Sequence, residues 1–109
     1  MNLSIVIPVF NSEEIISTLV DEISEQIKSN NLKTEIFLVN DLSKDLSWEK
    51  IKSLNKKYSF VKGINLINNY GQHNAIMAGL NHCNGDYCIL MDDDMQHNPK
   101  YIIDIYNKL

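Results

Sequence analysis

Residues Tyr87–Pro99 read Tyr-Cys-Ile-Leu-Met-Asp-Asp-Asp-Met-Gln-His-Asn-Pro, and this stretch decides how the chain is interpreted. An apolar run over residues 87–91 stops at three consecutive carboxylates, Asp92, Asp93 and Asp94. A short apolar run bounded by polar residues is typical of a buried strand. Three acids at the tip of such a strand repel one another unless a positive charge lies among them.

The spacing of these acids favours a divalent cation. In an extended chain Asp92 and Asp94 point to one side and Asp93 points to the other. Mg²⁺ is commonly held by one or two carboxylates together with the phosphates of a substrate. Asp92 and Asp94 are therefore the first candidates for a site that binds a metal ion and a diphosphate. The alternative is a solvated acidic turn that caps the following helix, since short acidic motifs are common.

Outward from this stretch, strand patterns and helix patterns alternate along the whole chain. Apolar runs predict strands over 3–10, 35–39, 60–67 and 87–91, and helical spacing predicts helices over 13–28, 47–58, 72–83 and 99–109. This order predicts an α/β fold, a Rossmann-like, mainly parallel sheet flanked by helices, with residues 1–109 as a single domain.

Local residue types predict how three of these elements begin or end. Asn11 and Ser12, followed by Glu13 and Glu14, indicate a helix start with a capping residue and acids in its first turn. Gly85 is expected to end the third helix in a left-handed conformation. Pro8 cannot donate to a sheet ladder, so strand pairing is expected to fade there.

Composition narrows the class of protein. The chain has 109 residues, which is one domain's worth of chain and small for a complete two-substrate enzyme. Its net charge of −4 argues against nucleic-acid binding, which needs a clustered basic surface. No stretch approaches the roughly 18 apolar residues of a transmembrane helix. We expect a cytoplasmic protein with Cys83 and Cys88 as reduced thiols in or near the core.

The predicted strands end in polar residues that should meet at one edge of the sheet. The first strand ends at residues 8–11, the second at Asn40 and Asp41, and the fourth at residues 92–94. In open parallel sheets, ligands bind outside the carboxyl ends of the strands. The sequence therefore predicts a nucleotide-type ligand at this edge.

Four segments in this order carry a resemblance to a known family. They are Ser-Ile-Val-Ile-Pro-Val-Phe-Asn (4–11), Val-Asn-Asp-Leu-Ser-Lys-Asp (39–45), Asn-Tyr-Gly-Gln-His-Asn-Ala-Ile-Met-Ala-Gly-Leu (69–80) and Met-Asp-Asp-Asp-Met-Gln-His-Asn-Pro (91–99). Together they resemble the N-terminal, donor-binding half of a family 2 glycosyltransferase with the GT-A fold. The third and fourth segments are closest to the branch that acts on polyprenyl phosphates.

The resemblance implies a nucleotide-diphosphate-sugar donor and a Mg²⁺ or Mn²⁺ ion. UDP-sugar is favoured and GDP-sugar is the alternative. The metal positions are Asp92 and Asp94. The implied donor-binding positions are Pro8, Phe10, Asn11, Glu13, Asp41, Gly71, Gln72, His73, Asp92 and Asp93.

Several of these positions also have a purely structural explanation. Asp41 matches the acid that accepts a hydrogen bond from the donor's base, and the alternative is an Asx turn after the second strand. Glu13 matches a donor contact, and the alternative is stabilisation of a helix dipole. Gly71, Gln72 and His73 match a phosphate site at a helix N-terminus, although a histidine there is more often a surface or packing residue.

The chain departs from the family pattern at three positions. Leu42 stands where the family usually has glycine, Asn40 replaces a frequent first acid, and Asp93 stands where a small residue is usual. The resemblance also implies that the acceptor side and the catalytic base belong to a later segment. No catalytic residue is therefore expected within residues 1–109, and the full-length protein is expected to associate with the cytoplasmic face of a membrane.

Two other classes of function remain open from the sequence. A nucleotidyltransferase also places acids at strand ends, but it would normally carry a basic Gly-rich loop after the first strand, where this chain reads Pro-Val-Phe-Asn-Ser-Glu-Glu. A non-catalytic nucleotide-binding or assembly module is the other class. It would use an unpaired sheet edge, and through that edge it would form a homodimer.

Overall fold

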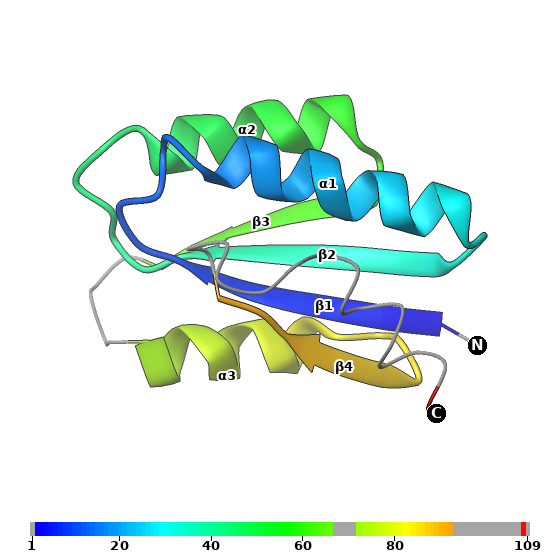
Figure 1. The fold of residues 1–109 in the computed structure, drawn as a ribbon. Helices are drawn as coiled ribbons and strands as arrows, with labels where there is room; N and C mark the ends of the chain where they lie inside the picture. The colour runs from blue at the N-terminus through cyan, green and yellow to red at the C-terminus, as the bar shows by residue number, and fades with distance from the viewer. Residues whose placement is uncertain (1, 67–71, 93–107, 109) are drawn as a thin grey trace.

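The computed structural model describes residues 2–66, 72–92 and 108, with Asn2, Gln72 and His73 described through their backbone. Strands and helices alternate throughout these residues (Figure 1). The elements are β1 (Asn2–Val9), α1 (Ile16–Ser29), β2 (Lys33–Asn40), α2 (Ser47–Lys57), β3 (Val61–Asn65), α3 (Gln72–His82) and β4 (Tyr87–Leu90). The expected helix over 99–109 lies outside the described residues.

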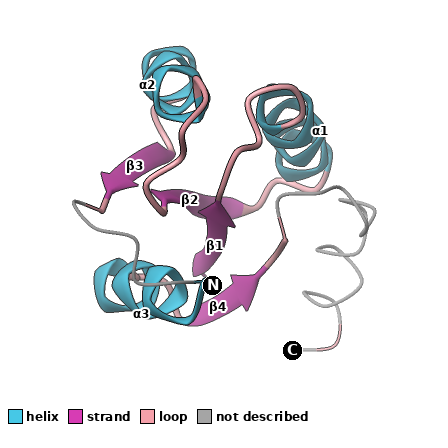
Figure 2. Cartoon of the chain, turned by 90° about the vertical axis from the view of Figure 1, so that its left-hand side faces the viewer, coloured by secondary structure: helices cyan, strands magenta, loops and turns pink. Residues whose placement is uncertain are grey.

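The four strands form one parallel sheet in the order β3-β2-β1-β4. In register, Ile5 lies between Ile36 of β2 and Ile89 of β4. The predicted α/β fold with a parallel sheet is therefore confirmed. Figure 2 looks onto the carboxyl ends of the strands and shows α1 and α2 on one face of the sheet and α3 on the other.

Strand β1 is buried on both faces, as a central parallel strand should be. Its odd-numbered residues 3–9 belong to a core that also contains Leu19 and Ile23 of α1 and Ile51 of α2. Val6 belongs to a second core with Phe37, Val39 and Ala75 of α3. The alternation of side chains along β1 thus supplies both layers of the core.

Helix α3 lies close to the sheet because it carries a glycine at the point of contact. A Cβ atom at Gly79 would be too close to Val6 Cγ1 and 3.2 Å from Val39 Cγ2. Glycine at this position therefore allows α3 to pack closely against the sheet.

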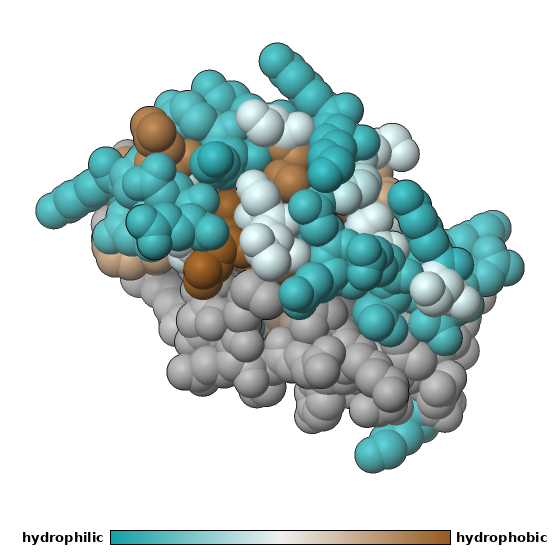
Figure 3. Space-filling model, turned by 45° about the horizontal axis from the view of Figure 1, so that its top comes forward, coloured by the Kyte–Doolittle hydropathy of each residue, from teal (hydrophilic) through white to brown (hydrophobic). Residues whose placement is uncertain are grey.

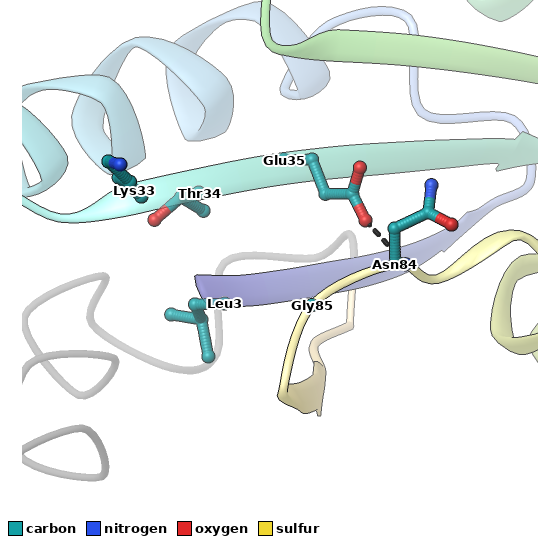
Figure 4. A pocket seen from close by; sticks show the side chains of 6 residues that line it. All are labelled: Leu3, Lys33, Thr34, Glu35, Asn84 and Gly85. Atoms are coloured by element: carbon teal, nitrogen blue, oxygen red, sulfur yellow. Dashed lines mark hydrogen bonds between the residues drawn. The ribbon is translucent and has the colours of Figure 1, made fainter. Parts of the chain in front are cut away.

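The turn between α3 and β4 is fixed at the amino edge of the sheet, opposite the polar strand ends. Glu35 Oε1 accepts hydrogen bonds from Ser4 Oγ at 2.6 Å and from the Asn84 N–H at 2.7 Å (Figure 4). The Gly85 N–H donates to Ser4 Oγ at 2.9 Å. Glu35, Asn84 and Gly85 line a hollow of about 220 Å³ that also borders Leu3 and Lys33. The network sets where β4 starts.

Two local expectations are wrong. Helix α1 begins at Ile16, so Glu13 and Glu14 lie in a preceding turn and no acid lies in its first turn. Gly85 does not adopt a left-handed conformation. A side chain there is excluded because its Cβ would lie 2.7 Å from Ser4 Oγ.

The fourth strand is less buried than its apolar sequence suggests. It is an outer strand of the described sheet, and Tyr87 and Leu90 are 41% and 50% exposed. Cys88 on this strand is also exposed, whereas Cys83 is half-buried, and neither forms a disulfide. The expectation of a core thiol is therefore wrong for Cys88. Among the described residues, no helix is long and apolar enough to cross a membrane.

Candidate functional site at the carboxyl edge of the sheet

The parallel pairing brings the polar ends of β1, β2 and β4 to one edge. The Asp41 N–H donates to the Val9 carbonyl at 2.9 Å on one side of β1. On the other side, the Met91 N–H donates to the Val6 carbonyl at 3.0 Å. Asp41 and Asp92 therefore both follow strands that are hydrogen-bonded to β1, which confirms the predicted convergence.

Pro8 explains why β4 leaves the sheet before β2 does. Pairing of β1 with β4 ends at Val6, whereas pairing with β2 continues past Pro8 to Val9. The next backbone donor of β1 toward β4 would be at position 8, and proline has no N–H. Strand pairing therefore fades at Pro8 on the β4 side only, and Asp92 lies where the chain departs.

The loops after β1 and β2 are joined by reciprocal hydrogen bonds. The Asn11 N–H donates to Ser43 Oγ at 3.0 Å, and the Lys44 N–H donates to Asn11 Oδ1 at 2.8 Å. Asn11 and Leu42 both have left-handed backbones, with φ of 52° and 53°. Asparagine tolerates this conformation, whereas leucine is strained in it. The two loops thus form one unit at the edge of the sheet.

The turn after β2 is closed by Asn40, which leaves the next side chain available. Asn40 Oδ1 accepts hydrogen bonds from the Ser43 hydroxyl and from the Ser43 N–H, the latter at 3.3 Å. Its Nδ2 donates to Asn65 Oδ1 at 2.8 Å. The turn-closing role that was the alternative for Asp41 is therefore taken by Asn40, whose side chain bonds Ser43 three residues further on.

Asp41 itself is buried without a complete set of partners. It is 5% exposed, and its Oδ1 atom has no hydrogen-bond partner among the residues that the structure describes. Burying an unpaired carboxylate oxygen costs free energy, so native proteins rarely retain one without a reason. A ligand that donates a hydrogen bond at this edge would supply the missing partner.

The Asp45 side chain holds the segments that precede α1 and α2, the two helices on one face of the sheet. Its Oδ2 atom accepts from the Glu13 N–H at 3.2 Å, and its Oδ1 atom accepts from the Ser47 N–H at 2.9 Å. Burial raises the pKa of the Asp45 carboxyl, but hydrogen bonds from Ser47 and Glu13 outweigh it and hold that pKa below 3.8. The Glu13 N–H is therefore already used and offers nothing to a phosphate.

A hollow of about 240 Å³ runs along the loop after β1. Its lining residues are Asn11, Ser12, Glu13, Glu14, Ile15 and Asp45. Three of them are acidic, so the hollow itself does not suit a diphosphate. The donor-contact role expected for Glu13 is not tested, and Glu13 lies in the turn that precedes α1 and not in the first turn of the helix.

Two large apolar side chains are exposed beside Asp41. Phe10 is 47% exposed and Leu42 is 46% exposed, and each adjoins one of the hydrogen-bonded loops. Exposed apolar side chains at a polar edge are suited to contact the flat face of a base or a ribose.

The structure gives less detail for the other residues that were predicted to bind the donor or the metal. Pro8 is buried in β1, and Gln72 and His73 belong to α3 through their backbone. Gly71, Asp93 and Asp94 lie outside the described residues. Sequence reasoning did not single out Ser43, Asp45 or Ser47 as functional neighbours. The sequence feature that could have indicated them is a turn rich in serine and aspartate immediately before a helix.

Of the two predicted metal ligands, Asp92 lies among the described residues and Asp94 does not. Asp92 is exposed just beyond the end of β4. An exposed carboxylate fits Mg²⁺ or Mn²⁺, which take few protein ligands when a diphosphate supplies the others. Within residues 2–66 and 72–92, no cluster of three His, Cys, Asp or Glu side chains could hold a metal by itself.

The chain is similar in sequence to two named bacterial transferases. Undecaprenyl-phosphate 4-deoxy-4-formamido-L-arabinose transferase of Yersinia pestis (strain Pestoides F) is 43% identical over 100 residues, which are 91% of this chain and 31% of that protein. The protein of the same name from Yersinia enterocolitica serotype O:8 is 42% identical over 100 residues, which are again 91% of this chain and 31% of that protein. The chain thus spans 31% of the length of these curated relatives.

Solved structures share the fold. TarS residues 1–349 of S. aureus in complex with UDP superposes with a TM-score of 0.80 at 24% identity, covering 98% of this chain and 31% of that chain. Mannosyltransferase PcManGT of Pyrobaculum calidifontis, in complex with GDP-Man and Mn²⁺, has a TM-score of 0.76 at 20% identity. The match covers 84% of this chain and 27% of that chain. A model of the family described as glycosyl transferase family 2 matches residues 4–109, and the chain therefore belongs to that family.

Proposed function

We propose that residues 1–109 form the donor-binding part of a metal-dependent, inverting glycosyltransferase that uses a nucleotide-diphosphate sugar. The observation that carries the proposal is the buried Asp41 carboxylate, whose Oδ1 atom has no partner at the carboxyl edge of a family 2 chain. Family membership favours glycosyl transfer over the nucleotidyl-transfer alternative.

The donor base is expected to bind at Asp41. A carboxylate accepts hydrogen bonds only, so it selects a base that presents an N–H group, such as the imide of uracil. Guanine also presents an N–H at the equivalent edge, whereas cytosine has an acceptor nitrogen in place of the imide N–H and keeps a donor only at its exocyclic amino group. UDP-sugar is the favoured donor, GDP-sugar is the alternative, and a cytidine nucleotide should bind poorly. Phe10 and Leu42 would contact the nucleoside from the exposed side.

The diphosphate is expected to lie toward Asp92. Asp92 and Asp94 would hold Mg²⁺ or Mn²⁺, which supplies positive charge that neutralises the diphosphate leaving group. A single or paired carboxylate is sufficient for such an ion when substrate oxygens complete its coordination.

The acceptor is proposed to be a polyprenyl phosphate, because the similar Yersinia proteins are named undecaprenyl-phosphate transferases. An oxygen of the acceptor phosphate attacks the anomeric carbon, and the bond from that carbon to the diphosphate oxygen breaks. The nucleoside diphosphate leaves with the bonding electron pair, and the configuration at the anomeric carbon inverts. The acceptor phosphate is already ionised at neutral pH, so little deprotonation is needed.

Calorimetric titration of UDP, GDP and CDP with Mn²⁺ tests the donor site. UDP should bind and Asp41→Asn should weaken it by roughly 10-fold or more, since a charged hydrogen bond contributes about 1.5–3 kcal/mol. The same variant should unfold at a higher urea concentration, because the amide is cheaper to bury than an unpaired carboxylate. Asp21→Asn, the same change on α1, is the matched control and should leave UDP affinity unchanged.

The metal is tested by the same titration without Mn²⁺ and with Asp94→Ala. Both changes should weaken the binding of UDP without altering its order relative to CDP. Failure of all three nucleotides to bind a folded protein would contradict the proposal. The expected homodimer stays a prediction, and light scattering over a range of concentrations tests it.

A further inference from the structure

The lysines of this acidic chain are concentrated in one region. The net charge is −4, yet six of the ten lysines lie within residues 44–62, where the acids are only Asp45 and Glu49. This stretch contains α2 and β3, which lie next to each other at one flank of the sheet (Figure 2). The lysines concerned are Lys44, Lys50, Lys52, Lys56, Lys57 and Lys62.

Three of these lysines line a groove between α2 and β3. The groove has a volume of about 670 Å³, with Lys52 and Lys56 on α2 and Lys62 on β3. Trp48 and Gly63 also line it, and a Cβ atom at Gly63 would lie 3.2 Å from the indole ring. A half-buried tryptophan thus lies among three cations.

Glu49 also lines the groove, so its three lysines and one acid leave it a net charge of +2. Within the described part of the chain, no ion pair joins an acid to Lys52, Lys56 or Lys62. The neighbouring Lys57, by contrast, contacts Asp21 at 3.0 Å. The face formed by α1 and α2 is otherwise largely hydrophilic, with small apolar areas between polar side chains (Figure 3). An anionic partner would complement the groove.

We propose that the α2–β3 groove docks on an anionic membrane surface, with Lys52, Lys56 and Lys62 facing lipid phosphates. Lysines near such a surface each contribute favourable energy, and an indole is suited to the boundary between headgroups and acyl chains. The choice of a membrane over an acidic protein rests on the proposed function, whose acceptor is a lipid phosphate. Docking through this flank leaves the carboxyl edge uncovered, because the flank runs along the strands (Figure 2).

Trp48 is the only tryptophan of the chain, so its fluorescence reports on this groove alone. The chain is titrated with phosphatidylglycerol vesicles and with phosphatidylcholine vesicles, each containing a fraction of brominated lipid. Quenching of Trp48 is expected with the anionic vesicles only, and it should fall as salt is added. Inorganic phosphate at the same phosphorus concentration should leave the fluorescence unchanged, which separates a membrane surface from free phosphate.

Two charge-matched variants make the test specific. Lys52→Gln with Lys56→Gln should weaken vesicle binding roughly 30-fold, from the contribution of about 1 kcal/mol for each lysine near an anionic surface. Lys28→Gln with Lys33→Gln changes the net charge equally, at exposed positions outside the groove, and should have little effect. Circular dichroism verifies that both variants fold.

Three results would overturn the docking proposal. They are equal losses in both double variants, sedimentation with vesicles without quenching of Trp48, and binding of poly-glutamate in place of vesicles. UDP titration of the same variants keeps the two proposals separate. In the unmutated chain, UDP binding without binding to anionic vesicles would count only against docking, and vesicle binding without UDP binding would count only against the donor site.

Discussion

The side-chain oxygen of Asn11 accepts a hydrogen bond from the backbone N–H of Lys44 at 2.8 Å, across 33 residues of sequence. Asn11→Ala and Asn11→Gly both remove this acceptor and should lower the free energy of unfolding by about 1 kcal/mol. Alanine also bears the strain of a φ of 52°, whereas glycine does not. Urea denaturation should find the glycine variant more stable than the alanine variant by roughly 0.5–1 kcal/mol. Equal stabilities would mean that the loop has relaxed to another conformation.

Leu42 is strained in the same way but lacks a hydrogen-bonding side chain. Leu42→Gly should raise the free energy of unfolding by roughly 0.5–1 kcal/mol, which is the strain relieved less the added entropy of the unfolded chain. Leu42→Ala keeps the strain and is the control. Differential scanning calorimetry of both variants measures the effect, and a glycine variant less stable than the wild type would contradict it.

Gly79 should not accept a side chain. Gly79→Ala would press a methyl group against Val6 and destabilise the protein by about 1–3 kcal/mol. Val6→Ala leaves space at the same place, so the double variant should lose less stability than the sum of the two single variants. A double-mutant cycle by urea denaturation measures this coupling, and simple additivity would contradict the contact.

Asp45 should make the free energy of unfolding depend on pH. Its pKa is lower in the folded protein than the ordinary 3.8, so its contribution is complete above that value and is lost as pH falls through the folded pKa. Asp45→Ala should therefore cost about 1 kcal/mol at pH 7 and progressively less below pH 4. Urea denaturation across this range tests it against Glu25→Ala, an exposed control. A loss that stays constant with pH would contradict the role of the ionised carboxylate.

The two cysteines should differ in reactivity. Burial, followed by a hydrogen bond with Cys88, raises the pKa of the Cys83 thiol to about 12. The thiolate is the reactive form, so iodoacetamide at pH 8 should modify the exposed Cys88 well before Cys83. Mass spectrometry of the digested protein measures the order, with Cys83→Ser and Cys88→Ser as controls. Faster modification of Cys83 would show that its surroundings open in solution.

The alternation of strands and helices could be predicted because it depends on local apolar spacing, as at residues 5–7 of β1. The start of α1 could not, because the turn over Ser12 and Glu13 is held by Ser47 and Asp45, which lie 35 and 32 residues away in the sequence. The place of Asp41 at the polar edge of the sheet could be predicted, but the closure of its turn by the Asn40 side chain could not. The exposure of Cys88 follows from the outer position of β4, which its apolar sequence does not reveal.

The reciprocal bonds between Asn11, Ser43 and Lys44 also limit how this edge of the sheet can diverge. An inserted residue in either loop would displace a donor or an acceptor that the other loop needs. The two loops therefore have to change length together, as a matched pair. The side chains at positions 10 and 42 take no part in these bonds, so the exposed surface of this edge can change while the length of both loops stays the same.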